Sequence, residues 1–407
     1  MNQMKTYQKL WKQSLAVVMI MSLCFPFAVK IKAEEQVIDN VFVVEGTTLK
    51  KYTGKEETVV IPNRIIKIGN RAFWRNDDIK TVILSDSVIE VGSQAFEFCS
   101  NLERVEFTKD VKKIGSFAFY DCENVKEIVG LDGVEQVGAH AFAYTLWLEE
   151  KQKKEPIVMI NTCVVDGRYS AGDVVIPDGA TFIAENAFYG AKIKTMEIPD
   201  SIKIIEENAL CLDELKTVKM GNGVEWMDFG VFESCRELEN VRLSNSLKVL
   251  PPLTFAYCEK LEEVTIPDSV INISFDAFYN CKNLKALTLP DTFEYYNPKY
   301  AVDLKRCAKD FTIYGIDVKN HFVIQTLAKE QGVRYKELAL NAKEKTLKQG
   351  DTYRLKFNSG AKCMWSSSNP EVATVNYYGL IAAKEKGTAT IVATLYGKDY
   401  TCKITVK

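Results

Sequence analysis

The stretch "VGSQAFEFCSNLERVEF", residues 91–107, recurs along the chain in varied form. It returns as "IGSFAFYDCENVKEIVG" (114–130), "FGVFESCRELENVRL" (229–243), "PLTFAYCEKLEEVTI" (252–266) and "FDAFYNCKNLKALTL" (275–289). Successive marker residues are 23, 23, 23, 46, 22, 22, 23 and 23 positions apart, and a fixed period in the twenties is typical of leucine-rich-repeat solenoids. The markers are Phe73, Phe96, Phe119, Phe142, Phe188, Leu210, Phe232, Phe255 and Phe278.

Each copy ends in a segment of the form L-x-x-V-x-I, in which apolar and polar residues alternate. Leu102, Val105 and Phe107 are one example. Alternation of this kind predicts a strand with one face in the core. One unit cannot bury its own apolar face, so neighbouring units must stack and share a core. We therefore expect a mainly β fold: a solenoid with repeats of about 23 residues.

The double step of 46 residues indicates an insertion. Residues 158–177, "VMINTCVVDGRYSAGDVVIP", echo residues 37–62 near the start of the array, and both contain an acidic residue followed by Gly between two apolar strands. This pattern predicts a hairpin in each place. We expect an N-terminal capping hairpin at 34–58 and a hairpin insertion at about 143–176, which divides the solenoid (59–337) into two blocks. The polar run 145–156 is expected to form a protruding loop.

The two ends of the chain have other patterns. Residues 1–33 carry lysines, then the apolar run 15–29, then Ala33, which together indicate a signal peptide and an exported protein. Residues 311–337 are expected to form a C-terminal cap that includes a helix. From 338 to 407, short alternating segments separated by Gly, Asn and Ser predict a small β-sandwich with Trp365 in its core.

Five cysteines share one repeat position, three residues after the marker: Cys99, Cys122, Cys235, Cys258 and Cys281. The same position elsewhere holds Asn, Thr, Ala or Asp, so it selects a small side chain that can hydrogen-bond locally. We interpret the cysteines as packed free thiols, with a disulfide between neighbours such as Cys99 and Cys122 as the alternative. A disulfide between Cys363 and Cys402 is a separate candidate.

The sequence offers little material for catalysis. It contains two histidines, and it has no HExxH motif, phosphate-binding loop or Cys-x-x-Cys pair. We expect no catalytic residue, cofactor or metal. After removal of residues 1–33 the chain has 47 basic and 54 acidic residues, a balance that gives no footprint for nucleic acid. No later segment is long and apolar enough to predict a membrane span.

Binding is the remaining class of function, and the outward positions of the predicted strands are its candidate residues. They form two columns across the coils. The candidate ligand face consists of Thr81, Ile83, Arg104, Glu106, Glu127, Val129, Glu197, Lys219, Arg242, Glu263 and Thr265.

The repeats resemble the BspA-type leucine-rich repeats of bacterial surface proteins. The match is carried by residues 61–84, "IPNRIIKIGNRAFWRNDDIKTVIL", by 261–278, "LEEVTIPDSVINISFDAF", and by 311–315, "FTIYG", and it covers roughly 40–337. Residues 365–375, "WSSSNPEVATV", and 379–393, "GLIAAKEKGTATIVA", resemble group 2 bacterial immunoglobulin-like domains.

The resemblance implies a secreted or cell-surface, non-catalytic protein that binds a host extracellular protein or glycoprotein, or a cell-wall component, as an adhesin does. Two alternatives stay open at this point. One is a structural component of the cell envelope without a host ligand, and the other is a carbohydrate-active enzyme.

Overall fold

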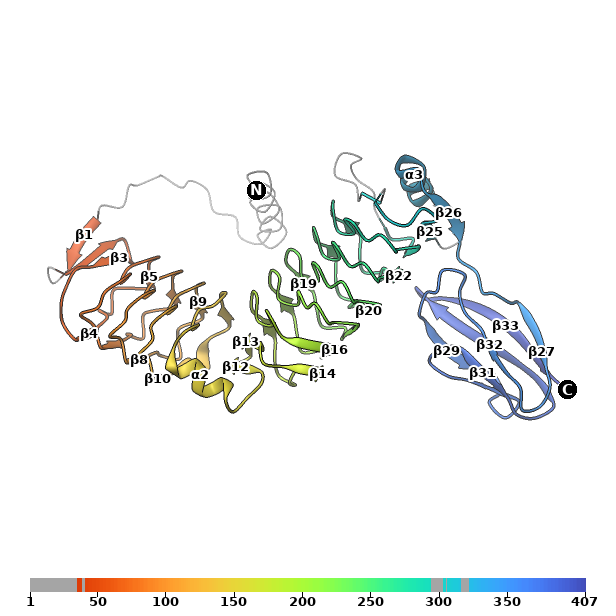
Figure 1. Ribbon diagram of the computed structural model, residues 1–407, viewed down its shortest axis with the longest axis horizontal. Coiled ribbons are helices and arrows are strands. Elements are labelled where there is room, and N and C mark those ends of the chain that lie inside the picture. The colour runs from red at the N-terminus through yellow and green to blue at the C-terminus, as the bar shows by residue number, and fades with distance from the viewer. Residues whose placement is uncertain (1–34, 39–40, 294–302, 305, 316–321) are drawn as a thin grey trace.

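The computed structural model describes residues 35–38, 41–293, 303–304, 306–315 and 322–407. The predicted signal peptide, 1–33, lies outside these residues. The chain forms a curved array of stacked coils followed by a β-sandwich (Figure 1), and the prediction of a mainly β solenoid is confirmed. The described part contains two α-helices, which are α2 (Leu146–Gln152) and α3 (Phe322–Gln331).

Each regular coil contributes one short strand to each of two parallel sheets, because its apolar residues alternate in two separate segments. In the first block the two-residue strands join the N-terminal hairpin in one sheet, while the three-residue strands form the other. The first sheet comprises β1 (Glu35–Ile38), β2 (Phe42–Glu45), β3 (Thr48–Tyr52), β5 (Lys67–Ile68), β7 (Glu90–Val91), β9 (Lys113–Ile114) and β11 (Gln136–Val137). The second comprises β4 (Thr58–Val60), β6 (Thr81–Ile83), β8 (Arg104–Glu106) and β10 (Glu127–Val129).

The second block repeats this arrangement in two new sheets, which are not hydrogen-bonded to the first pair. One comprises β12 (Val158–Ile160), β13 (Cys163–Asp166), β15 (Phe182–Ile183), β17 (Ile204–Ile205) and β19 (Trp226–Met227). The other comprises β14 (Ala171–Val175), β16 (Lys192–Ile198), β18 (Thr217–Met220) and β20 (Asn240–Arg242). Two further sheets follow, one of β21 (Val249–Leu250) and β23 (Asn272–Ile273), the other of β22 (Glu263–Thr265), β24 (Ala286–Leu289), β25 (Thr312–Gly315) and β26 (Arg334–Glu337).

The marker residues form the centre of the solenoid core. Phe96 is fully buried, and its ring stacks between those of Phe73 and Phe119 at centroid distances of 4.6 and 4.9 Å. These spacings match the 4.7–4.9 Å separation of neighbouring strands, so stacked coils place identical rings in van der Waals contact. The repeat of an aromatic side chain at one position thus builds two stretches of a ring column, from Phe73 to Phe142 and from Phe232 to Phe278, with Leu210 at the marker position between them.

The segment at 143–176 opens the second block. Its strands β12 and β13 pair antiparallel, as β1, β2 and β3 do at the N-terminus. The expectation of a loop at 145–156 was wrong in part, because residues 146–152 form α2. The Thr145 hydroxyl accepts a hydrogen bond from the Leu148 amide and caps the helix. Leu148 is buried and Trp147 packs against the solenoid core, which anchors the helix.

The solenoid ends in a β-helix-β cap. Strand β26 pairs parallel with β25, and α3 connects them, with Leu327 and Ala328 buried. The helix stops at Gly332, whose φ of +67° favours glycine. The amide of Gly332 donates to the carbonyl of Lys329 and the amide of Val333 to that of Ala328, which is a Schellman arrangement.

Residues 344–406 form a sandwich of a four-stranded and a three-stranded sheet. Its core contains Ile391, Cys402 and Ile404, and Trp365 packs against this cluster while staying half-buried. The first sheet comprises β27 (Glu344–Leu347), β33 (Lys398–Val406), β32 (Gly387–Leu395) and β29 (Met364–Ser367). The second comprises β28 (Thr352–Arg354), β31 (Leu380–Ala383) and β30 (Ala373–Val375).

Candidate functional site

The five repeat cysteines are free, fully buried thiols. Each thiol donates a hydrogen bond to the carbonyl of the marker residue in the preceding coil; Cys99 reaches Phe73 at 3.1 Å and Cys122 reaches Phe96 at 2.9 Å. Cys235, Cys258 and Cys281 do the same with Leu210, Phe232 and Phe255. The thiols therefore pack and join coils, and the interpretation as packed free thiols agrees with the structure.

The candidate disulfide between Cys363 and Cys402 is not formed. Cys402 pairs with Ile391 across β32 and β33, whereas Cys363 precedes Met364, which pairs with Thr394. Three or more residues along β32 separate the two positions, a distance of about 10 Å that exceeds the Cα window for a disulfide. Both cysteines alternate with residues expected to face inward, and this pattern predicts that they share one core. In fact Cys363 faces the cluster against the solenoid.

The candidate ligand face is accessible on one side of the solenoid but divided among three sheets. Thr81, Ile83, Arg104, Glu106, Glu127 and Val129 lie on β6, β8 and β10. Glu197, Lys219 and Arg242 lie on β16, β18 and β20, while Glu263 and Thr265 lie on β22. Val129 is 38% exposed, and Ile83, the other apolar member, is half-buried.

Among the face residues on β6, β8 and β10 and on β16, β18 and β20, neighbouring carboxylates neutralise every cation but one. Arg104 forms ion pairs with both Glu106 and Glu127. The Nζ atom of Lys219 lies 3.1 Å from a carboxylate oxygen of Glu197. Arg242 is exposed, and no ion pair or hydrogen bond engages its guanidinium among the residues that the structure describes. The face thus has an uncommitted cation at its C-terminal end.

A proline interrupts the solenoid at the same place. In the other coils the residue after each two-residue strand donates its backbone amide to the previous coil, as Asp228 does to Ile205 and Ser274 does to Leu250. Pro251 occupies this position in the coil between them and has no amide hydrogen. Strands β19 and β21, and likewise β20 and β22, fall in different sheets. The two coils stay hydrogen-bonded through the turns that follow β19 and β21, where the Phe232 amide donates to the Thr254 carbonyl.

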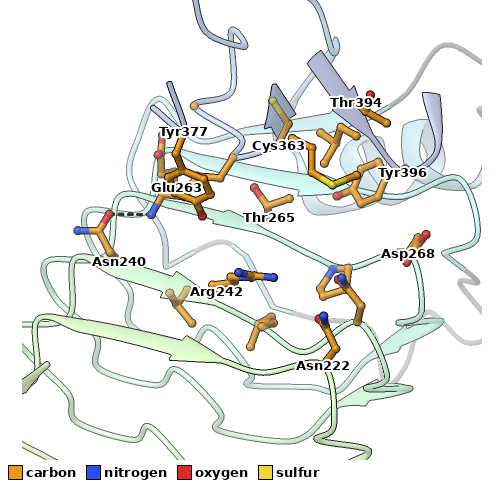
Figure 2. Close-up of a pocket in the computed structure, with 18 of the residues that line it drawn as sticks. Asn222, Asn240, Arg242, Glu263, Thr265, Asp268, Cys363, Tyr377, Thr394 and Tyr396 are labelled. Carbon is orange, nitrogen blue, oxygen red and sulfur yellow. Dashed lines mark hydrogen bonds between the residues drawn. The ribbon is translucent and has the colours of Figure 1, made fainter. Parts of the chain in front are cut away.

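A cavity of about 530 Å³ lies over this interruption, between the solenoid and the sandwich (Figure 2). Arg242, Glu263 and Thr265 line it from the strands, and Tyr377 and Tyr396 line it from the sandwich. Clefts between domains are the usual location of binding sites. Three of the candidate face residues therefore belong to a walled recess rather than an open surface.

The sandwich is docked on the solenoid by specific contacts. The Tyr396 hydroxyl is buried and donates a hydrogen bond to the carbonyl of Ile266 at 2.5 Å. The Lys362 ammonium donates to the Asn240 amide oxygen at 2.9 Å. Gly360, at φ +77°, approaches Glu263 so closely that an added Cβ would lie 1.5 Å from its Oε2 atom. These contacts hold the two walls of the recess together.

Desolvation by the docked sandwich affects the charges in the recess. It raises the pKa of Glu263, against the opposing effect of Lys362 and Lys356. It lowers the pKa of Lys362, against the opposing effect of Glu263. Both side chains keep accessible surface, yet for each of them the loss of water outweighs the mutual attraction. The charges of Glu263 and Lys362 therefore attract each other without making up for the loss of water, and Arg242 is not among the causes of either shift.

The sequence does not predict this recess, because the outward positions of β20 and β22 follow the same alternation as those of the other strands. A signal was present in Pro251, the one proline at the amide-donor position among the regular coils. The docking of the sandwich could not be predicted, because the pattern of residues 338–407 does not indicate which part of this domain contacts the solenoid.

Across the residues that the structure describes, His, Cys, Asp and Glu side chains are not gathered in threes in a way that suits a metal ion. The same ranges contain no helix with the length and apolar character required to cross a bilayer.

The chain is similar to several solved structures, all with TM-scores below 0.5. A leucine rich cell surface protein of Faecalibacterium prausnitzii A2-165 has 24% identity and a TM-score of 0.27, over 66% of this chain and 90% of that one. A leucine-rich repeat protein of Bacteroides ovatus ATCC 8483 has 20% identity and a TM-score of 0.35, over 72% and 71%. The leucine rich repeat protein of T. pallidum has 20% identity and a TM-score of 0.28, over 58% and 91%.

A curated relative, the kappa-carrageenase of Pseudoalteromonas carrageenovora, is 36% identical over 80 residues. This match spans 18% of the chain and about a fifth of the length of the relative.

The family comparison covers far more of the chain. The profile of the "BspA type Leucine rich repeat region" matches six copies over residues 51–164 and 181–301, and that of the "Bacterial Ig-like domain (group 2)" matches residues 336–403. The first match alone exceeds half of the chain and coincides with the stacked coils. The chain belongs to the BspA-type leucine-rich repeat family and carries a group 2 bacterial immunoglobulin-like domain after its repeats.

Proposed function

We propose that the protein is a secreted, non-catalytic binding protein of the cell surface, adhesin-like, that recognises a host extracellular protein or glycoprotein, or a cell-wall component. The observation that carries the proposal is the recess at the end of the strand face, where Arg242 is exposed and unused by the fold. Arg104 and Lys219 of the same face are neutralised by neighbouring carboxylates, whereas no ion pair within the described residues engages Arg242. Membership of the family supports the surface location.

The experiment is a binding screen with the purified protein against immobilised matrix proteins, mucins, glycans and bacterial wall fragments. Replacing Arg104, Glu106 and Glu127 by alanine tests the first part of the face. The exposed Lys112–Glu135 pair, directly before strands β9 and β11 of the other sheet, gives a matched control when both residues become alanine. Saturable binding that survives the control change supports a binding function. Comparing the control with the Arg104, Glu106 and Glu127 replacements shows whether the first part of the face takes part in it.

Binding to wall fragments alone would instead favour the structural alternative, in which the protein is held in the envelope without a host ligand. An absence of saturable binding to every immobilised class would contradict the proposal.

A further inference from the structure

The recess combines an uncommitted cation, neutral hydrogen-bonding groups and an exposed aromatic wall. From this combination we infer that it binds an acidic saccharide, with Arg242 pairing the carboxylate of one sugar acid and the neutral side chains bonding the ring hydroxyls. This inference rests on the proposed function and names the ligand class for the C-terminal end of the face.

The position of Arg242 selects an anion. Its neighbour in register on β18 is Lys219, whose own charge is bound to Glu197. No carboxylate stands opposite Arg242 in the β18–β20 pair. A guanidinium presents parallel N–H donors that fit a carboxylate in bidentate fashion. A single carboxylate entering from the cavity would therefore satisfy donors that the fold leaves open.

The neutral groups around the cation suit hydroxyls. Asn222, Asn245 and Thr265 line the recess, and their side chains make no hydrogen bond within the described residues. An amide offers two donors and two acceptor sites, and a threonine hydroxyl offers both functions. Sugar hydroxyls also donate and accept at once, so they match this set better than a ligand with carbonyl acceptors alone.

The opposite wall suits the apolar face of a sugar ring. Tyr377 is 57% exposed and Met364 is 72% exposed, and both belong to the sandwich. The face of an aromatic ring packs against C–H groups by dispersion, and methionine adapts its shape to irregular surfaces. These two side chains are the large exposed hydrophobic groups of the recess, and a pyranose ring would cover them.

The geometry of the floor excludes a peptide that adds as a strand. Strands β20 and β22 are not hydrogen-bonded, so their facing edges are open. Yet these strands retain Cα atoms within 8 Å of each other. A strand inserted between two others needs about 9.6 Å, twice the ordinary spacing. The gap between the open edges is therefore too narrow for a peptide strand. The ligand is instead recognised by the side chains above the strands.

The balance of charge limits the number of anionic groups in the ligand. The cations Arg242 and Lys362 line the recess together with the acids Glu239, Glu263 and Asp268. Acids outnumber bases, so a chain with many negative charges would be repelled at short range. One carboxylate directed at Arg242 is tolerated. We therefore expect selectivity for a sparsely charged saccharide over a polysulfated one.

The test is calorimetric titration of the whole protein with sialyllactose and with an oligosaccharide that carries a single terminal galacturonic acid, beside their carboxyl-reduced counterparts and heparin. We expect saturable binding of at least one carboxylated saccharide, a loss of tenfold or more on reduction of its carboxyl group, and weaker binding of heparin. Arg242→Gln should reduce the affinity tenfold or more. Lys112→Gln, outside the candidate ligand face, should change it less than twofold.

A second variant guards against a misfolded first one. Asn245→Asp places a negative charge on an exposed position of the recess without removing any contact within the protein, and it should weaken acidic saccharides far more than neutral ones, because both lose the amide donors but only the acidic ones are repelled. Equal affinity for the acidic and reduced sugars, tighter binding of heparin, or no saccharide binding at all would each overturn the inference. If the protein still binds a matrix protein in the screen above, the proposed function stands and only the ligand class is rejected.

Discussion

The first block of coils and the coils beneath the sandwich follow one repeat but use it differently. In the first block, β4, β6, β8 and β10 form an unbroken ladder and Arg104 is held by two carboxylates. Around Pro251 the ladder stops, and Arg242 has no partner among the described residues. The ring column is also looser there, with centroids 5.5 and 5.6 Å apart at Phe255 against 4.6 and 4.9 Å at Phe96. The candidate site thus lies where the repeat lacks ladder hydrogen bonds, where a charged side chain has no ion pair among the described residues, and where the rings are spaced more widely.

The largest expected effect is loss of a ring from the column. Phe96→Ala should cost about 3–5 kcal/mol of unfolding free energy, because a fully buried aromatic side chain leaves a cavity. Phe255→Ala should lie toward the lower end of that range, since its stacking contacts are longer. Chemical denaturation of both variants measures the difference, and a larger cost at Phe255 would show that the contrast in packing is not energetic.

The sequence predicted the stacked coils and their strands well, because both follow from a marker residue that occurs nine times at nearly regular spacing. Phe96 and Val105 are buried as their positions required. It predicted single contacts less well. The loop expected at 145–156 is partly α2, since Leu148 and Trp147 gain core contacts that composition does not reveal. The recess depends on how 338–407 docks, and docking is set by tertiary contacts such as Tyr396 to Ile266, which no local pattern encodes.

The buried thiols give a pH-dependent comparison of the two regions. Burial raises the pKa of Cys235 to about 12, from 9.0 for an ordinary thiol. Both folded and unfolded chains hold this proton below pH 9. Above it the unfolded chain loses the proton first, so stability falls as the pH rises from 9 toward 12, by about 1.4 kcal/mol per pH unit for such a thiol.

Cysteine labelling followed by mass spectrometry locates this effect. Cys258 and Cys281 lie beyond the interruption at Pro251, so we expect them to react before Cys99 and Cys122 when the pH is raised. Cys235→Ser should make the fall in stability above pH 9 less steep by the share of one thiol, because a hydroxyl does not titrate there. Simultaneous labelling of all five positions would mean that the solenoid opens as one unit in spite of the interrupted ladder.

A smaller effect is expected where the sandwich docks. Tyr396→Phe removes the hydroxyl that donates to the Ile266 carbonyl and leaves that acceptor buried. The expected loss is about 1–3 kcal/mol, the cost of leaving a buried acceptor without its hydrogen bond. It should appear as faster proteolysis between 338 and 343 and as weaker saccharide binding, with the unfolding of the first block unchanged. Tyr353→Phe, in the sandwich but away from the recess, is the matched control, and equal effects of the two changes would contradict a fixed junction.

The smallest stability effect should come from the two arginines of the face. Arg104→Gln breaks exposed ion pairs with Glu106 and Glu127, which are worth about 0.2–1 kcal/mol. Arg242→Gln breaks none among the described residues, so its unfolding free energy should stay within about 0.5 kcal/mol of the parent. Ligand binding should show the opposite order, with Arg242→Gln severe and Arg104→Gln mild for acidic saccharides. A residue that the fold does not need, but that binding does, is what distinguishes the recess from the scaffold; if Arg242→Gln destabilised the protein more than Arg104→Gln, that distinction would fail.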